Sequence, residues 1–371
     1  MTEIVHVKNV MNVANDNNLS GAYPLFLGED MGFSDGINVT YPELVDLAKE
    51  QRGQYWQPEE HSLAQDKLDF REDPKTGDIM VRNLMSQWLM DSVAARSIMS
   101  LLEPFISNNE MFELVAEWMY YETIHSRTYA YILREAIPDN SGILERAKAD
   151  VSVTYRSRVI SKVFNETYQL AAAYSSGLPV DMYQVKLQLL KTFVALFGLE
   201  SIGFMNSFSC TFAITETGKY QGIGNEITAI MKDEMLHGRF GKTVLDIMRF
   251  KEGYEQIFQE NKAALRDILV ETCKQELSFA EYIFSEGRRT VGCNTDMLCL
   301  NTAYLSKPAF DSLDMEFPYD LMPEVPTSHP LPYMEKYMNP DMIQSAAQEI
   351  TLTNYLVAKT VDDVGDSEFD F

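Results

Sequence analysis

Apolar residues recur at helical spacing along most of the chain, whereas the alternating pattern typical of strands is nearly absent. The predicted helices cover residues 41–51, 78–107, 112–132, 143–175, 181–215, 226–250, 253–287 and 294–306. From Pro308 onward frequent prolines oppose further long helices, because proline lacks the backbone N–H that a helix interior uses. We therefore predict an all-α fold, with an N-terminal arm over residues 1–50, a helical domain over residues 51–338 and a flexible acidic tail over residues 339–371.

Composition limits which kinds of partner the protein could bind and indicates in which cellular compartment it is expected. The 371-residue chain is 46% hydrophobic, and its 55 acidic and 31 basic residues give a formal net charge of −24. This charge disfavours nucleic acid and anionic membranes and is compatible with a basic patch on a protein partner. We find no signal peptide and no apolar span of about 18 residues, so no membrane segment is predicted. The four cysteines lack zinc and disulfide-framework spacing, which indicates reduced thiols in a cytoplasmic protein.

The segment from Glu122 to Tyr129 carries the first candidate chemistry. On a helix, with Glu122 at zero, His125 lies at about 300° and Tyr129 at about 340°, so the three side chains share one stripe. A Glu and a His three residues apart can hold the same metal ion. A lone motif of this kind is more often a surface pair or a core histidine, and the chain contains another, from Glu3 to His6, near an N-terminus that we expect to be frayed.

The motif is repeated, and each copy has a carboxylate at a similar distance upstream. Glu234 and His237 form the second copy; Asp91 lies 31 residues before Glu122, and Glu200 lies 34 residues before Glu234. Both upstream carboxylates stand in apolar runs, where an unpaired charge is costly. Two facing helical hairpins would unite four carboxylates and two histidines, as in ferritin-like dimetal proteins. Such oxygen-rich ligation favours iron or manganese over zinc or copper.

With these residues in view, the chain resembles the small, radical-generating subunit of class I ribonucleotide reductase, from about Trp56 to the C-terminus. Four segments carry the resemblance, residues 90–92, 122–129, 199–204 and 232–237. It implies a ferritin-like bundle in which Asp91, Glu122 and His125 bind metal one and Glu200, Glu234 and His237 bind metal two, with Glu122 also bridging. The implied cofactor is two iron ions in a diiron-oxo centre; dimanganese and mixed manganese–iron centres stay open.

The resemblance also assigns roles that spacing alone does not. Tyr129 matches the tyrosine that holds the stable radical, and Phe204, Phe208 and Ile230 match its apolar pocket. Trp56 and Asp233 match a proton-coupled electron-transfer chain that ends at His125. Tyr355 matches the tail residue that relays the radical to the large, catalytic subunit. The acidic tail would dock there, with Phe369 and Phe371 as candidate anchors, and a homodimer is implied.

The expected function is therefore that of the radical-generating subunit of ribonucleoside-diphosphate reductase, which supplies the oxidant for making deoxyribonucleotides. A ferritin-like diiron oxidase and an iron-storage protein are the alternatives. Storage needs neither a tyrosine at position 129 nor a long acidic tail. An oxidase needs a substrate channel beside the metals, where Phe204 and Phe208 stand. A radical subunit that keeps its oxidant on the metals usually replaces the tyrosine.

Overall fold

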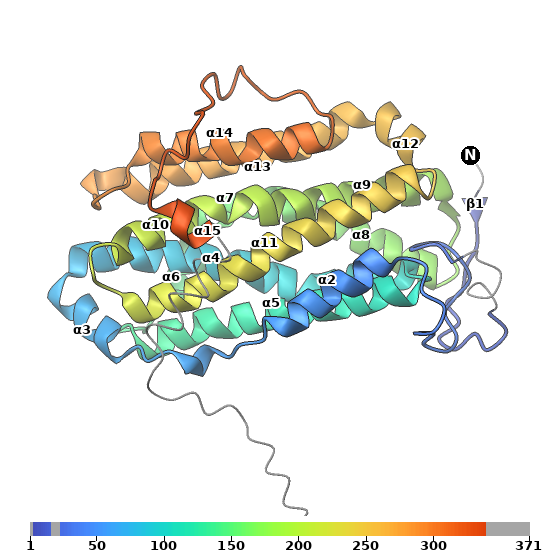
Figure 1. Ribbon diagram of the computed structural model, residues 1–371, viewed down its shortest axis with the longest axis horizontal. Coiled ribbons are helices and arrows are strands. Elements are labelled where there is room, and N and C mark those ends of the chain that lie inside the picture. Colours follow the sequence, from blue (N-terminus) through green and yellow to red (C-terminus); the bar gives the residue numbers. More distant parts are fainter. Residues whose placement is uncertain (1–2, 16–22, 339–371) are drawn as a thin grey trace, which may run out of the picture.

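The computed structural model describes residues 3–15 and 23–338, and its long helices run side by side along the longest axis of the molecule (Figure 1). The long helices are α4 (Pro74–Leu102), α5 (Asn109–Glu135), α8 (Arg158–Ser175), α9 (Met182–Gly198), α11 (Gln221–Phe250), α13 (Lys262–Phe284) and α14 (Thr295–Ser312). The shorter helices are α2 (Pro42–Gly53), α3 (Ala64–Glu72), α6 (Ile143–Ala149), α7 (Val151–Arg156), α10 (Met205–Thr215), α12 (Glu255–Glu260) and α15 (Met334–Met338). The strands β1 (Glu3–Ile4) and β2 (Val180–Asp181) form one small antiparallel pair. The predicted all-α fold is confirmed.

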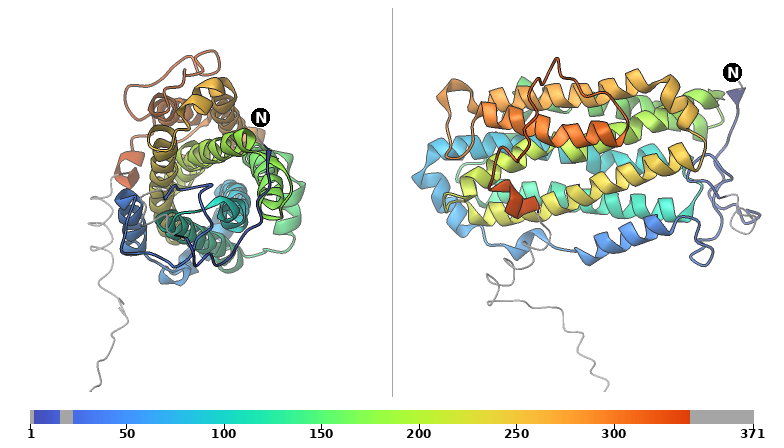
Figure 2. Two further views of the ribbon diagram at one scale, coloured as in Figure 1. Left: turned by 90° about the vertical axis from the view of Figure 1, so that its right-hand side faces the viewer. Right: turned by 45° about the horizontal axis from the view of Figure 1, so that its top comes forward.

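The helices enclose one apolar core. Helices α4 and α5 form a hairpin, α2 packs on α5 and α11, and α9 packs against α8, α11 and α13. Seen along the bundle, α13 and α14 cover one side of it and α2 lies on the other (Figure 2). The core cluster runs through all the long helices. The cysteines are unpaired, as predicted.

Side-chain caps fix where the key helices begin. Asn108 accepts a hydrogen bond from the Met111 N–H at the start of α5, as N-cap residues do. Helix α11 has no side-chain cap of its own, and α3 supplies one instead. Asp66 accepts from the Ile223 N–H at 2.9 Å, and Asp69 accepts from the Tyr220 N–H at 2.8 Å.

Four helix predictions need correction. The segment predicted as one helix over 253–287 is divided at Asn261 into α12 and α13. The segment predicted as one helix over 143–175 is divided at Asp150 and Ser157, where Asp150 caps a new helix. The segment predicted over 181–215 is interrupted by a π-helical turn at Leu199–Gly203, which we call the π-turn. Helix α14 continues through Pro308 to Ser312, beyond its predicted end, because its packing against α13 offsets the cost of a proline in a helix interior.

The N-terminal arm is attached to the bundle in the part that the structure describes. The expected fraying at Glu3–His6 was wrong, since β1 pairs with β2 and the His6 ring stacks on Tyr174 with centroids 4.3 Å apart. Further along, Leu25 and Phe26 are buried in the core. Apolar anchors of this kind explain why a segment rich in polar residues is nevertheless ordered.

One stretch among the described residues, Met182–Thr215, is long and apolar enough to cross a membrane by length and composition. This apolar stretch was not recognised from the sequence. The qualifying window is 89% buried inside the bundle, so its apolar character is also that of a central core helix.

Candidate metal centre

Six polar side chains meet in the middle of the bundle, and none is more than 1% exposed. They are Asp91 from α4, Glu122 and His125 from α5, Glu200 from the π-turn, and Glu234 and His237 from α11. The two helical hairpins predicted from the sequence therefore face each other. Each Glu-x-x-His pair points inward because its helix presents this face to the core.

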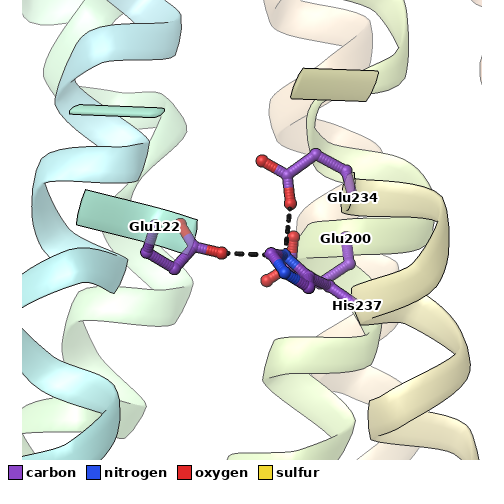
Figure 3. A group of neighbouring side chains, drawn as sticks. All are labelled: Glu122, Glu200, Glu234 and His237. Carbon is purple, nitrogen blue, oxygen red and sulfur yellow. Dashed lines mark hydrogen bonds and ion pairs between the residues drawn. The ribbon is translucent and has the colours of Figure 1, made fainter. Parts of the chain in front are cut away.

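Both histidines contact both of the glutamates that lie between them. His237 Nδ1 is 3.0 Å from Glu122 Oε1 and 3.0 Å from Glu234 Oε2, and Figure 3 shows these two carboxylates reaching His237 from different helices. His125 Nδ1 is 3.0 Å from Glu234 Oε1 and 3.9 Å from Glu122 Oε2. The imidazole centroids are 5.7 Å apart. Glu234 thus spans the two histidines, as does Glu122, the residue expected to bridge.

The ligand atoms divide into two neighbouring groups, each small enough to surround one ion. One group comprises Glu122, Glu200, Glu234 and His237, and the other comprises Asp91, His125 and Glu234. Within each group the ligand atoms lie within 4.8 Å of one another. This geometry fits a dimetal site in which the two ions share carboxylates.

The chemistry of these groups also fits cations. Neither oxygen of Asp91 nor of Glu200 has a hydrogen-bond partner among the described residues. Burial, followed by the neighbouring carboxylates, raises the pKa of Asp91, Glu200 and Glu234 well above the ordinary value. Burial also raises the pKa of Glu122, to about 7. Buried carboxylates without donors are costly, and metal ligation offsets that cost while displacing their protons.

The two histidines differ in electrostatic environment. Burial alone would lower the pKa of His125, but its hydrogen bond with Asp233 and the charge of Glu122 outweigh burial and raise it to about 9. Burial and the nearby His125 lower the pKa of His237 well below its ordinary value. A carboxylate on the far nitrogen of a ligating histidine fixes its tautomer and its orientation, and Asp233 is placed to do this for His125.

Asp233 is the hub of a buried chain that leads away from His125. Its Oδ2 atom accepts from Trp56 Nε1 at 2.8 Å and lies 3.0 Å from His125 Nε2, and its Oδ1 atom accepts from Gln51 Nε2 at 2.8 Å. The Trp56 and His125 ring centroids are 6.2 Å apart. The structure thus brings Trp56, Asp233 and His125 into one hydrogen-bonded row.

Two residues of this site were missed by the sequence reasoning. Trp118 Nε1 donates to Glu122 Oε1 at 3.1 Å. Its position four residues before Glu122, on the same face of one helix, was a usable signal. Gln51 lies 182 residues from Asp233 in the chain, and nothing local marks it.

Tyr129 is fully buried on α5, one helical turn beyond His125. Burial and the charge of Asp91 raise the pKa of its phenol well above the ordinary value. Phe204, Phe208 and Ile230 are likewise fully buried, and the two phenylalanine rings stack with centroids 5.7 Å apart. Tyr355, Phe369, Phe371 and the predicted docking tail lie outside the described residues.

Comparison with known proteins identifies the family. The sequence model of the family described as "Ribonucleotide reductase, small chain" matches residues 36–325, more than three quarters of the chain. The chain belongs to this family. The predicted membership of the class I ribonucleotide reductase small subunits is thereby confirmed, and with it an oxidoreductase role as a subunit of ribonucleoside-diphosphate reductase.

Curated relatives of this ribonucleotide reductase small chain match it over nearly their whole length. The ribonucleoside-diphosphate reductase subunit beta of Haemophilus influenzae is 28% identical over 362 residues, covering 94% of this chain and 95% of that protein. The subunit beta of Enterobacteria phage T4 is 27% identical over 367 residues, covering 92% and 94%.

Solved structures share the fold. The ribonucleotide reductase R2 subunit from Clostridium botulinum has a TM-score of 0.75 at 18% identity, over 90% of this chain and 99% of that one. The dimanganese(II)-NrdF of Streptococcus sanguinis has a TM-score of 0.62 at 16% identity, over 79% and 95%. The predicted ferritin-like bundle is confirmed by these likenesses.

Proposed function

We propose that this chain generates and stores a tyrosyl radical at Tyr129 beside a dimetal-carboxylate centre. The radical would be transferred reversibly to a large catalytic subunit that reduces ribonucleotides. The observation that carries the proposal is the meeting of six fully buried ligand side chains, several without hydrogen-bond donors, one helical turn from a fully buried tyrosine. The family of the chain supports it, because small chains of this family work with a large subunit.

The ligand assignment is the one that the family resemblance implies, and the two groups of neighbouring side chains support it because Asp91 and His125 fall in one group and Glu200 and His237 in the other. We assign Asp91, Glu122 and His125 to one ion and Glu200, Glu234 and His237 to the other. Glu122 and Glu234 are shared, as their contacts with both histidines support. Hard oxygen donors with one imidazole per ion suit iron, our first expectation, and equally suit manganese or a mixed pair. When bound, the two ions would supply the redox chemistry that uses dioxygen to oxidise a nearby side chain.

The residues around Tyr129 would control its proton and its lifetime. The buried phenol holds its proton firmly, so its oxidation must remove an electron and a proton together. Among the neighbouring carboxylates, Asp91 has the largest effect on the pKa of Tyr129. One of its carboxylate oxygens would receive that proton. Phe204, Phe208 and Ile230 would keep water and reductants away, as their complete burial supports.

The route out of the centre would be the row from His125 through Asp233 to Trp56, supported by its continuous hydrogen bonds. Tyr355 and the acidic tail would continue it to the large subunit. Homodimer formation and a cytoplasmic location belong to the same proposal. Deleting residues 362–371 should abolish capture of this chain by a reductase large subunit, and unchanged capture would refute the docking role of the tail.

The decisive experiment is electron paramagnetic resonance of the metal-free chain after addition of ferrous iron and oxygen, beside a Tyr129→Phe control. An organic radical doublet in the wild type only, with two ions bound in both proteins, is the expected result. If iron binds tightly but no radical forms, the experiment is repeated with manganese and a flavoprotein activator. If that also gives no radical, the diiron oxidase alternative is tested next. Failure to bind two ions per chain would refute the six-ligand centre.

A further inference from the structure

The π-turn that carries Glu200 frees one backbone carbonyl from the helical ladder. The usual donor to the Gly203 carbonyl would be the N–H of Ser207, four residues on. In the structure the N–H groups of Ser207 and Phe208 both donate to the Phe204 carbonyl instead, at 3.0 and 3.1 Å. A buried carbonyl without a donor is costly, so the π-turn persists only where another group satisfies it.

A buried guanidinium fills this role. Arg156 Nη2 donates to the Gly203 carbonyl at 2.7 Å. The same guanidinium grips Glu276 of α13 through two bonds, Nε to Oε1 at 2.6 Å and Nη2 to Oε2 at 2.8 Å. It also lies over the Phe279 ring, 3.8 Å from the centroid, and both charged side chains are 1% exposed. Arg156 therefore ties the end of α7, the π-turn and α13 together.

The π-turn is clamped between two helices. On one side a Cβ atom at Gly238 of α11 would come within 2.9 Å of Ser201 Oγ, which shows how closely α11 approaches. On the other side α13 packs against the π-turn, and a Cβ atom at Gly198, the residue just before the turn, would come within 2.9 Å of Leu269 on α13. The position of Glu200 between α11 and α13 therefore depends on what fixes the turn.

We propose that Arg156, held by Glu276, is a positioning residue that fixes the π-turn and thereby aims the Glu200 carboxylate at the metal centre. This inference rests on the proposed function, in which Glu200 is a ligand. Arg156 acts through the backbone of the turn and touches no ligand atom. Lysine cannot replace it, because one ammonium nitrogen cannot span the Gly203 carbonyl and both carboxylate oxygens as the guanidinium fork does.

The test must separate positioning from stability. Removing Arg156 alone would leave Glu276 buried without a partner, which is strongly destabilising. The double variant Arg156→Met/Glu276→Leu removes both charges and refills the space, and such replacements are often tolerated. A control pair with the same bonding pattern lies at the far end of α11, where Arg249 donates two hydrogen bonds to the partly exposed Glu255 and lies over the Phe258 ring, so Arg249→Met/Glu255→Leu is made in parallel.

Two readouts, hydrogen exchange of the metal-free full chain and its affinity for Mn²⁺ alone, are taken, and the melting temperature serves as the check on folding. Hydrogen exchange of the backbone amides at residues 199–208 should accelerate in the Arg156→Met/Glu276→Leu variant and in no other core segment. Of the two Mn²⁺ sites, one should weaken by about tenfold or more, as loss of outer support for a ligand does, while the melting temperature stays near that of the wild type. The control pair should change neither readout.

A stable double variant with both Mn²⁺ affinities at the wild-type level would overturn the proposal. If that variant does not fold, Arg156→Lys decides: it keeps a charge beside Glu276, and the same single weakened site is expected, whereas two wild-type sites refute positioning. A wild-type chain that binds fewer than two Mn²⁺ ions would refute the proposed function instead. The exchange comparison would then still report whether Arg156 fixes the turn.

Discussion

Glu226 is a buried carboxylate outside the candidate metal centre, and its titration should be visible in the stability of the protein. It lies on α11, two turns before Glu234, with no exposed side-chain surface. Neither oxygen has a hydrogen-bond partner among the described residues, and His61 Nδ1 lies 3.3 Å from Oε1. Burial raises the pKa of Glu226 from 4.5 to about 7; His61 opposes this shift, and the charges of Glu60 and Glu59 add to it.

The sign and size of the effect follow from this shift. Between pH 4.5 and 7 the folded state keeps a proton that the unfolded chain has released, so the stability that Glu226 contributes is complete below pH 4.5 and is lost as the pH rises through 7. At about 1.4 kcal/mol per pKa unit, the loss amounts to roughly 3 kcal/mol. Glu226→Gln cannot ionise, so its free energy of unfolding should gain about 3 kcal/mol relative to wild type across this interval.

The assay is urea unfolding of metal-free wild type and Glu226→Gln at constant ionic strength between pH 4.5 and 8.5. Other titrating groups contribute equally to both proteins, so the difference curve isolates Glu226. His61→Leu removes the group that opposes the shift, and its loss of stability should extend to higher pH. Glu281→Gln, at an exposed position on α13, is the control. A difference curve for Glu226→Gln that is flat, or that falls with pH, would refute the reasoning.

Three further changes test the metal centre and its surroundings. Gly238→Ala would place a Cβ atom 2.9 Å from Ser201 Oγ, which can rotate away, so a metal titration should show Mn²⁺ binding close to that of the wild type, as for Gly241→Ala with 3.5 Å to its nearest neighbours; a clear loss in Gly238→Ala alone would show that the π-turn had to move. Phe208→Ala should cost about 3–5 kcal/mol in urea unfolding by opening a core cavity, and should shorten the lifetime of the radical signal; an unchanged lifetime would exclude Phe208 as a barrier. Asp233→Asn should lower nucleotide reduction with the large subunit by about 10–100-fold while radical formation persists, and equal loss of both activities would place Asp233 in metal binding instead.

The sequence predicted the bundle and the ligand helices because both depend on local periodicity. Glu122, His125 and Tyr129 share a stripe on any regular helix, and Glu234 with His237 repeats it. Helix geometry, with 3.6 residues per turn, places these side chains on one face whatever other helices pack against it. The same holds for the all-α fold class, since the apolar spacing of the long helices recurs throughout the chain.

The features that were not predicted depend on contacts between distant segments. The π-turn at Glu200 is supported by Arg156 and Glu276, which no local pattern joins to it. Gln51 meets Asp233 across 182 positions, and His61 meets Glu226 in the same non-local way. Helix α14 runs through Pro308 because its apolar face packs on α13, so tertiary packing outweighs the local cost of a proline.

Charge balance distinguishes Asp233 from the four carboxylates that we propose as metal ligands. When ionised, the four carboxylates that we propose as ligands would carry four negative charges, which two divalent ions would balance while both histidines are neutral. Asp233 adds one further charge, and its hydrogen bonds come from Gln51, Trp56 and His125, which hold that charge without neutralising it. It is therefore placed to stabilise positive charge that develops on either ring. Asparagine keeps the shape of this hub but removes the charge, so Asp233→Asn distinguishes an electrostatic role along the proposed route from a purely geometric one.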